Sequence, residues 1–167
     1  MPAAGFSART EDLLGRAAKI CAARGVRLTE LRRQVLGLIL DAGAPAGAYD
    51  LLELLRRTRL GAAPPTVYRA LDFLREQGLI HRLERLSSFV GCVAHDGEGH
   101  DHAAQFLICR TCAKVTEIAD SSVAQALRQA AQRQGFSVSG ATIEAEGLCA
   151  ACAPSSPSPE ITPSRNN

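Results

Sequence analysis

Two Cys-x-x-Cys pairs constrain the fold of this chain more than any other feature of its sequence. Cys109 and Cys112 form the first pair, and Cys149 and Cys152 form the second, with 36 residues between them. Two thiolates at this spacing can bind one ion, and two such pairs complete a tetrahedral zinc site with Zn–S distances of about 2.3 Å. A strand, a helix and a returning strand would bring the pairs together. Because a closed four-cysteine site leaves no position for a substrate, we expect a structural zinc.

The competing interpretation of the two pairs is redox chemistry between dithiols. Neither pair lies in a thioredoxin-like strand–Cys-x-x-Cys–helix context. Residues 1–12 contain no apolar run typical of a signal peptide, and no apolar stretch reaches the roughly 18 residues that span a bilayer. We therefore expect a cytoplasmic location, where six cysteines favour metal binding over disulfides.

Charge divides the chain into two unlike halves. Residues 1–86 carry 14 Lys and Arg against 9 Asp and Glu, whereas residues 87–167 carry 5 against 8. Five of the six cysteines and three of the four histidines lie in the second half. With 46% hydrophobic residues, the chain as a whole has a globular composition. A basic half followed by a half rich in metal-ligand types predicts a polyanion-binding module joined to a module with another task.

The first half has the element order of a winged helix-turn-helix. Apolar spacing predicts helices at 11–24, 29–42, 50–59 and 65–77, and short apolar runs predict a hairpin with strands at 79–83 and 88–92. Thr29 is a typical N-cap for the second helix, and Pro65 suits the first turn of the fourth. We therefore predict a DNA-binding domain over residues 1–92.

The fourth predicted helix carries the candidate base-reading residues. Tyr68 and Arg69 lie near its N-terminus, the end by which recognition helices enter the major groove. Arginine matches the O6 and N7 atoms of guanine, and an aromatic ring can contact the methyl group of thymine. The alternative is that both side chains simply cover a solvated helix face. The basic first half and the hairpin favour DNA binding.

The second half is predicted to be a small α/β domain connected by a hinge. Residues 93–103 are polar, contain two glycines and are interpreted as the hinge. The domain spans 104–152, a size at which a core generally needs a metal or a partner subunit. Its predicted strands are 105–109, 115–118 and 136–145, and its helix is 121–134, with Val123, Ala124, Leu127, Ala130 and Ala131 on the inner side. Residues 153–167, with four prolines and four serines, are predicted to be a disordered tail, and the whole chain is predicted to be α+β.

A second set of candidate metal ligands surrounds the hairpin and the hinge. The set comprises His81, Cys92, His95, His100, His102 and Glu117. An ion held by ligands from both domains would fix their relative orientation and so control the affinity for DNA. A mixed thiolate, imidazole and carboxylate set favours zinc over manganese or magnesium. Spacing alone does not choose among the histidines, and each residue also has an ordinary structural explanation.

Several segments together resemble the ferric uptake regulator family, and within it the zinc uptake regulator branch. The segments are Lys19-Ile-Cys-Ala, Arg27-Leu-Thr, Ala48-Tyr-Asp-Leu-Leu, Pro64-Pro-Thr-Val-Tyr-Arg-Ala-Leu-Asp-Phe-Leu with Gln77-Gly, and Ile143-Glu-Ala-Glu-Gly-Leu-Cys-Ala-Ala-Cys. They extend over about residues 10–152. The Pro-Thr-Val-Tyr-Arg segment and the paired cysteines are specific for the family, and the Gly-Leu-Cys-Ala-Ala-Cys ending indicates the branch.

The resemblance implies a bacterial, dimeric, metal-dependent transcription factor with an N-terminal winged helix and a C-terminal α/β dimerisation domain. It implies two zinc ions per chain, a structural ion at Cys109, Cys112, Cys149 and Cys152 and a regulatory ion at His81, Cys92, His102 and Glu117. His102 lies seven residues before Cys109, and Glu117 lies eight after it, which is the pattern of the branch. The segment between Cys92 and His102 is longer than is usual in the branch, and it offers His95 and His100 as substitutes.

The implied function is that of a zinc-responsive repressor and not of an enzyme. The zinc-loaded homodimer would bind AT-rich inverted-repeat operators of zinc-uptake genes and release them when zinc is scarce. Tyr68 and Arg69 would contact bases, while Tyr49, Thr66 and Arg82 would position the DNA backbone. One alternative is a family member that senses another metal or peroxide, against which Cys92 speaks. The other is a cytosolic redox or zinc protein, although the sequence holds neither a deaminase motif nor His-Glu-x-x-His.

Overall fold

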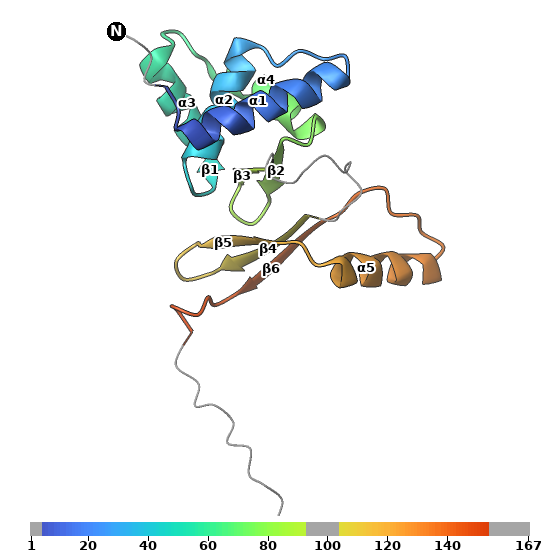
Figure 1. Cartoon of the computed structure of the whole chain (residues 1–167). Helices are drawn as coiled ribbons and strands as arrows, with labels where there is room; N and C mark the ends of the chain where they lie inside the picture. The colour runs from blue at the N-terminus through green and yellow to red at the C-terminus, as the bar shows by residue number, and fades with distance from the viewer. Residues whose placement is uncertain (1–4, 93–103, 154–167) are drawn as a thin grey trace, which may run out of the picture.

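The computed structural model describes residues 5–92 and 104–153. Four of the five helices in these ranges come before most of the strands, and the strands form two separate mixed or antiparallel sheets, so the predicted α+β class is confirmed. Helices α1 to α4 pack together at one end, two three-stranded sheets follow, and α5 lies beside the second sheet (Figure 1). The predicted hinge and nearly all of the predicted tail lie outside the described residues. Within the described ranges, no helix is both long enough and apolar enough to cross a membrane.

The four N-terminal helices begin and end close to the predicted positions. They are α1 Ala8–Ala23, α2 Glu30–Asp41, α3 Ala48–Thr58 and α4 Pro64–Glu76. Thr29 is the N-cap of α2, as predicted, but its side chain makes no capping hydrogen bond. Pro64 and Pro65 occupy the first turn of α4, where an N–H group would have no helical partner in any case.

The apolar faces of these four helices form one continuous core. Its fully buried side chains include Leu14, Leu36, Leu51, Leu55, Leu71 and Leu74. Burial of one leucine side chain contributes about 1.5–3 kcal/mol, so this core is the main source of stability in the N-terminal part of the chain. The opposite face of α4 remains exposed and presents Tyr68 and Arg69 to solvent.

A glycine motif ends α4 and directs the chain into the next strand. Gly78 has a φ of 63°, and its N–H donates to the Arg75 carbonyl. The N–H of Leu79 donates to the Leu74 carbonyl. These two bonds satisfy carbonyl groups that the helix end would otherwise leave unpaired, and the left-handed conformation that they need is one that glycine adopts readily.

A three-stranded sheet completes the N-terminal part. Strands β2 Ile80–Leu83 and β3 Ser88–Gly91 pair antiparallel, as predicted, and we call this hairpin, with its turn at residues 84–87, the wing. A third strand, β1 Ala46–Gly47, pairs with the other side of β3 and was not predicted. Two residues are too few to show an alternating pattern, so only the pairing defines this strand.

The second sheet has the order β5-β4-β6. Strand β4 Ala104–Cys109 is central, pairs antiparallel with β5 Val115–Ile118 and pairs in parallel with β6 Thr142–Gly147. The prediction of a strand from residue 136 is wrong in its first half. The N–H of Phe136 instead donates to the Ala131 carbonyl and caps the preceding helix, so the chain extends only from residue 142.

Helix α5 Ser121–Arg133 connects β5 to β6 and lies beside one end of the sheet instead of covering it (Figure 1). Asp120 caps the helix by accepting a hydrogen bond of 2.8 Å from the Ser122 N–H. The prediction that one face of α5 packs on its own domain is wrong for the single chain. Of the five residues predicted for that face, only Ala124 is buried. Val123 and Leu127 are 37% and 36% exposed.

The wing contacts the second sheet through a small apolar cluster. Leu83 of the wing is fully buried against Ala104, Phe106 and Ile108 of β4. The rings of His81 and Phe106 meet edge to face, with 5.6 Å between their centroids. The face of the sheet that carries Phe106 therefore supports the wing.

Candidate metal centres and DNA-binding surface

The parallel pairing of β4 with β6 brings the two Cys-x-x-Cys loops to the same end of the second sheet. Cys109 is the last residue of β4 and lies opposite Gly147, the last residue of β6. Cys112 follows in the turn after β4, and Cys149 and Cys152 lie in the turn after β6. The strand, helix and returning strand expected between the pairs are β5, α5 and β6.

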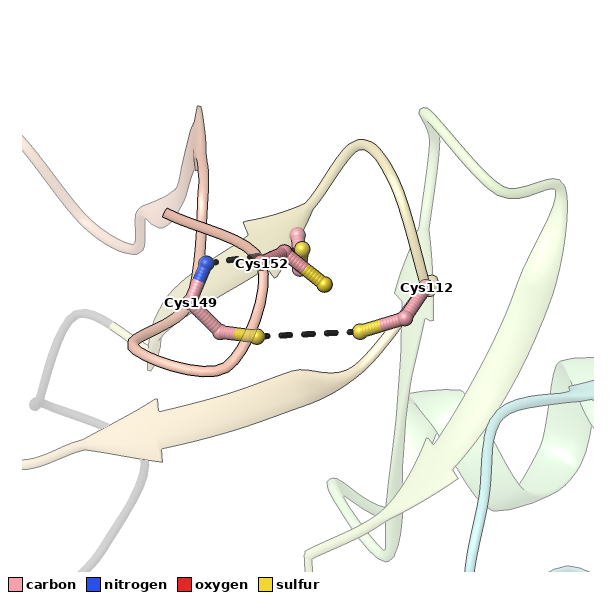
Figure 2. A group of neighbouring side chains, drawn as sticks. Cys112, Cys149 and Cys152 are labelled. Carbon is pink, nitrogen blue, oxygen red and sulfur yellow. Dashed lines mark hydrogen bonds between the residues drawn. The ribbon is translucent and has the colours of Figure 1, made fainter. Parts of the chain in front are cut away.

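The four thiols converge in one group, the four-cysteine cluster (Figure 2). All four sulfur atoms lie within 4.8 Å of one another, and the sulfurs of Cys112 and Cys149 are 3.7 Å apart. Zinc with Zn–S bonds of about 2.3 Å and tetrahedral angles needs sulfurs about 3.8 Å apart. The cluster therefore fits a tetrahedral zinc ion. Across residues 5–92 and 104–153 it is the one group of three or more His, Cys, Asp and Glu side chains close enough to hold a metal.

Backbone amides prepare the four-cysteine cluster for a cation. Hydrogen bonds from the N–H groups of Cys112, Cys149 and Thr111 lower the pKa of Cys109 from 9.0 to about 6. A hydrogen bond with Cys152 lowers the pKa of Cys149 and raises that of Cys152 to about 12. The backbone therefore favours the thiolate at Cys109, and zinc binding has to displace the protons that remain on the cluster.

His81 and Cys92, two of the predicted regulatory ligands, are in direct contact. The Nε2 atom of His81 is 2.8 Å from the sulfur of Cys92. His81 lies on β2, and the N–H of Cys92, just after β3, donates to the Leu79 carbonyl. Pairing of the wing strands thus brings the two side chains together. Burial and the charge of Glu117 raise the pKa of Cys92 to about 11.

Glu117 approaches the same contact from the second sheet. It lies on β5 opposite Phe106 and, with Val90 and Phe106, lines one side of a pocket of about 180 Å³ whose other side is the end of α2 and the segment that follows it. Within the described residues, His81, Cys92 and Glu117 do not complete a metal-binding group. The fourth predicted ligand, His102, and its alternatives His95 and His100 lie outside the described residues.

The residues predicted to contact DNA lie in the N-terminal halves of α3 and α4 and on the wing. Tyr49 is 72% exposed at the start of α3, and Tyr68 is 55% exposed on α4 beside the exposed Arg69. Thr66 is partly buried in the first turn of α4. Arg82 is exposed on the wing, where its guanidinium lies 3.2 Å from the Glu84 carboxylate. Exposed tyrosines leave large apolar rings in water, which is typical of surfaces that bind a partner.

Residues 23–146 match the model of the ferric uptake regulator family. The chain belongs to this family. Among its relatives, the zinc uptake regulation protein of Escherichia coli strain K12 is 46% identical over 143 residues, which cover 86% of this chain and 82% of the relative.

Solved structures of the ferric uptake regulator family resemble the chain in the arrangement of both parts. A zinc uptake regulator in complex with zinc and DNA has a TM-score of 0.78 and 45% identity, covering 85% of this chain and 93% of the other. Holo XcZur gives a TM-score of 0.75 at 42% identity, with coverages of 84% and 96%. Apo XcZur gives only 0.50 at 43% identity, with coverages of 86% and 97%. At nearly equal identity, the chain is thus more similar in structure to holo XcZur than to apo XcZur.

One polar contact of this family member was not predicted. The carboxylate of Glu144 on β6 accepts hydrogen bonds from the backbone N–H groups of Glu84 and Arg85 in the wing turn, at 2.8 and 3.1 Å. The Arg85 guanidinium pairs with Glu146, two residues further along β6. Sixty residues separate Glu84 from Glu144, so no local pattern connects them.

Proposed function

We propose that this chain is a zinc-responsive transcriptional repressor that binds operator DNA as a zinc-loaded homodimer and releases it when zinc is scarce. The observation that carries the proposal is the contact of His81 with Cys92 on the wing, faced by Glu117 of the second sheet. Residues with metal-binding side chains thereby lie on both sides of the boundary between the two parts of the chain. The family match, and relatives named as zinc uptake regulators, support it.

We assign the four-cysteine cluster to the structural zinc. Bound there, zinc would supply cross-linking energy, with apparent values of roughly 10–16 kcal/mol in small zinc domains. The β5-β4-β6 sheet and α5 bury few large side chains of their own, Phe106 being the largest that is fully buried. The four thiolates would therefore hold the ends of β4 and β6 together where apolar packing is thin.

We assign the regulatory zinc to His81, Cys92, Glu117 and His102, giving two zinc ions per chain. A tetrahedral ion would need the His81 nitrogen and the Cys92 sulfur about 3.6 Å apart, so this pair, at 2.8 Å, would have to separate slightly. Two of these residues belong to the wing and Glu117 belongs to the second sheet. They can share one ion only in one relative placement of wing and sheet, so zinc would favour that placement. The difference between the holo and apo matches supports this switch.

In the zinc-loaded placement, α4 would enter the major groove. Arg69 and Tyr68 would contact base edges, while Tyr49, Thr66 and Arg82 would contact the phosphate backbone and fix the register. The basic charge of residues 1–86 would attract the polyanion over longer range. The operators would be AT-rich inverted repeats at zinc-uptake genes, and binding there would exclude polymerase.

The exposed apolar side chains of the C-terminal part support a homodimer. Val123 and Leu127 on α5 and the nearby Phe136 remain accessible in the single chain, at 37%, 36% and 66%. A second copy of this chain would cover them, and a dimer is the symmetric partner for an inverted repeat. We accordingly divide the chain into a DNA-binding domain at 1–92, a hinge at 93–103, a dimerisation domain at 104–152 and a tail at 153–167, acting in the bacterial cytoplasm.

The test is capture of genomic DNA fragments on the purified full-length protein, with free zinc buffered high in one arm and low in the other. We expect a few promoter-borne inverted repeats to be retained only at high zinc. Equal retention in both arms would remove zinc as the signal and favour a family member that senses another metal or peroxide. Absence of enrichment in both arms would overturn DNA binding altogether.

A further inference from the structure

The second sheet presents one row of three side chains to the wing. Phe106 of β4 lies opposite Glu117 of β5 on one side and opposite Glu144 of β6 on the other. Residues that face each other across neighbouring strands project from the same face of a sheet. The row therefore places one carboxylate at each edge of the sheet, with the Phe106 ring between them against His81.

The two carboxylates of this row contact opposite ends of the wing. Glu117 lies near Cys92, at the base of the hairpin, where its charge affects the thiol. Glu144 lies at the tip, where each of its oxygens accepts one N–H from the turn, one from Glu84 and one from Arg85. Successive N–H groups that point to one carboxylate form a small anion-binding nest. Glu144 fills this nest from within the protein.

The proposed regulatory zinc would attach the wing to the second sheet at the base of the hairpin. That attachment alone would leave the wing free to rotate about its base. A second attachment at the tip removes this freedom, and the apolar contact of Leu83 with β4 lies between the two. The wing follows α4 directly through the Gly78 turn, whose two hydrogen bonds link helix end and strand start, so we expect the direction of the wing to affect the direction of α4.

We propose that Glu144 is a positioning residue for DNA binding, which seats the wing turn on the second sheet and favours the same domain arrangement as the regulatory zinc. This inference rests on the proposed function. The Glu144 contact and the regulatory zinc both stabilise the same arrangement of wing and sheet. Each therefore increases the affinity of the other by the same factor. Loss of the Glu144 contact should therefore weaken zinc binding at the regulatory site, although Glu144 is not one of its assigned ligands.

Three variants of the full-length protein test the inference. Glu144→Gln keeps the size of the side chain but replaces one acceptor oxygen with an N–H₂ group that cannot accept from the turn. Glu144→Asp keeps the charge and retracts the carboxylate from the turn. Glu146→Gln, two residues further along β6, makes the same chemical change but removes only the exposed ion pair with Arg85, which should matter little.

The readouts are zinc affinity of the regulatory site by titration with buffered zinc, affinity at saturating zinc for the duplex recovered by genomic capture, and amide hydrogen exchange at Glu84 and Arg85. We expect both Glu144 variants to bind zinc and DNA about five- to tenfold more weakly, a modest coupling, and to exchange these two amides faster. Glu146→Gln should stay within twofold of the wild type. Melting temperatures close to that of the wild type would show that lost stability is not the cause.

The possible results separate the inference from the function on which it rests. Wild-type affinities in Glu144→Gln, or Glu144→Asp behaving like the wild type while Glu144→Gln does not, would overturn the positioning role. The second pattern would show that the charge of Glu144, and not its contact, acts on zinc. A wild-type protein that binds the duplex equally with and without zinc would overturn the proposed function itself.

Discussion

Cys109 is the thiol of the four-cysteine cluster that the backbone prepares most strongly for zinc. Three N–H groups donate to its sulfur and hold its pKa near 6, compared with 9.0 for an ordinary thiol. Because the pKa of Cys109 is lower in the folded protein than in the unfolded chain, its ionisation stabilises the folded loops. This contribution is complete above pH 9.0, the ordinary pKa of the thiol. This contribution is lost as the pH falls through about 6.

We therefore expect the apparent zinc affinity of the four-cysteine cluster to fall as the pH falls, because protons compete with zinc for the thiolates, and to fall more steeply once Cys109 also takes up a proton near pH 6. The measurement is zinc transfer to a chromophoric chelator along a pH series, followed in parallel with the circular dichroism of the C-terminal part. A zinc affinity that does not depend on pH would contradict the assignment of zinc to these four thiolates.

Arg69 has the exposure and position expected of a base-contacting residue on α4. Arg69→Ala should weaken specific DNA binding by about 1–3 kcal/mol, because a bidentate contact with guanine contributes that much discrimination. Arg133→Ala is the matched control, since it removes the same charge from the last turn of α5. Affinities for the captured duplex and for a scrambled duplex would separate the two effects. If both variants lose affinity equally for both duplexes, Arg69 acts only through its charge.

At the scale of elements, the sequence predicts a helix or strand correctly where the residues that determine it lie within the element itself. Helices α1 to α4 and the wing strands follow from apolar spacing, caps and glycine stops within each segment. The Cys-x-x-Cys pairs are equally local, and their convergence needs only a returning strand. Strand β1 could not be predicted, because its two residues become a strand only by pairing with β3, some forty residues away.

Helix α5 shows a different limit of sequence analysis. Its apolar stripe was predicted to face the core of its own domain, but only Ala124 is buried there, because the spacing of apolar residues does not tell what the face packs against. The contact of Glu144 with the wing turn is similar, because its partners lie sixty residues earlier. Both features depend on the placement of complete elements, which single-residue patterns do not encode.

The exposed stripe of α5 leads to a prediction about assembly. Leu127→Glu should shift the protein from dimer to monomer without unfolding it, because the side chain is already 36% exposed in the single chain and a buried charge at an interface is costly. Gln125→Glu, on the other side of the helix, is the control and should remain dimeric. Sedimentation velocity measures both. A dimeric Leu127→Glu protein would place the interface elsewhere.

At the scale of the whole molecule, the proposed function makes the junction between wing and sheet the place where metal binding acts on DNA binding. Cys92→Ser should leave the fold and the structural zinc intact but abolish the zinc dependence of DNA binding, because a serine hydroxyl is a poor zinc ligand. Cys21→Ala is the control, since Cys21 is a fully buried thiol of the helical core and belongs to neither set of candidate zinc ligands. Zinc content and operator affinity at high and low zinc measure the outcome. A Cys92→Ser protein that still responds to zinc would exclude Cys92 as a ligand.

The parallel pairing of β4 with β6 also has a consequence for synthesis on the ribosome. Cys149 follows Cys109 by forty residues, so a nascent chain carries the first thiol pair for some time before the second pair exists. The helical core draws mainly on residues before 81, has many local contacts and can fold during that interval. During that interval Cys109 and Cys112 have no second thiol pair with which to complete the site. The closed four-thiolate site can therefore form only after the second pair has been made, so the C-terminal sheet closes later than the helical core.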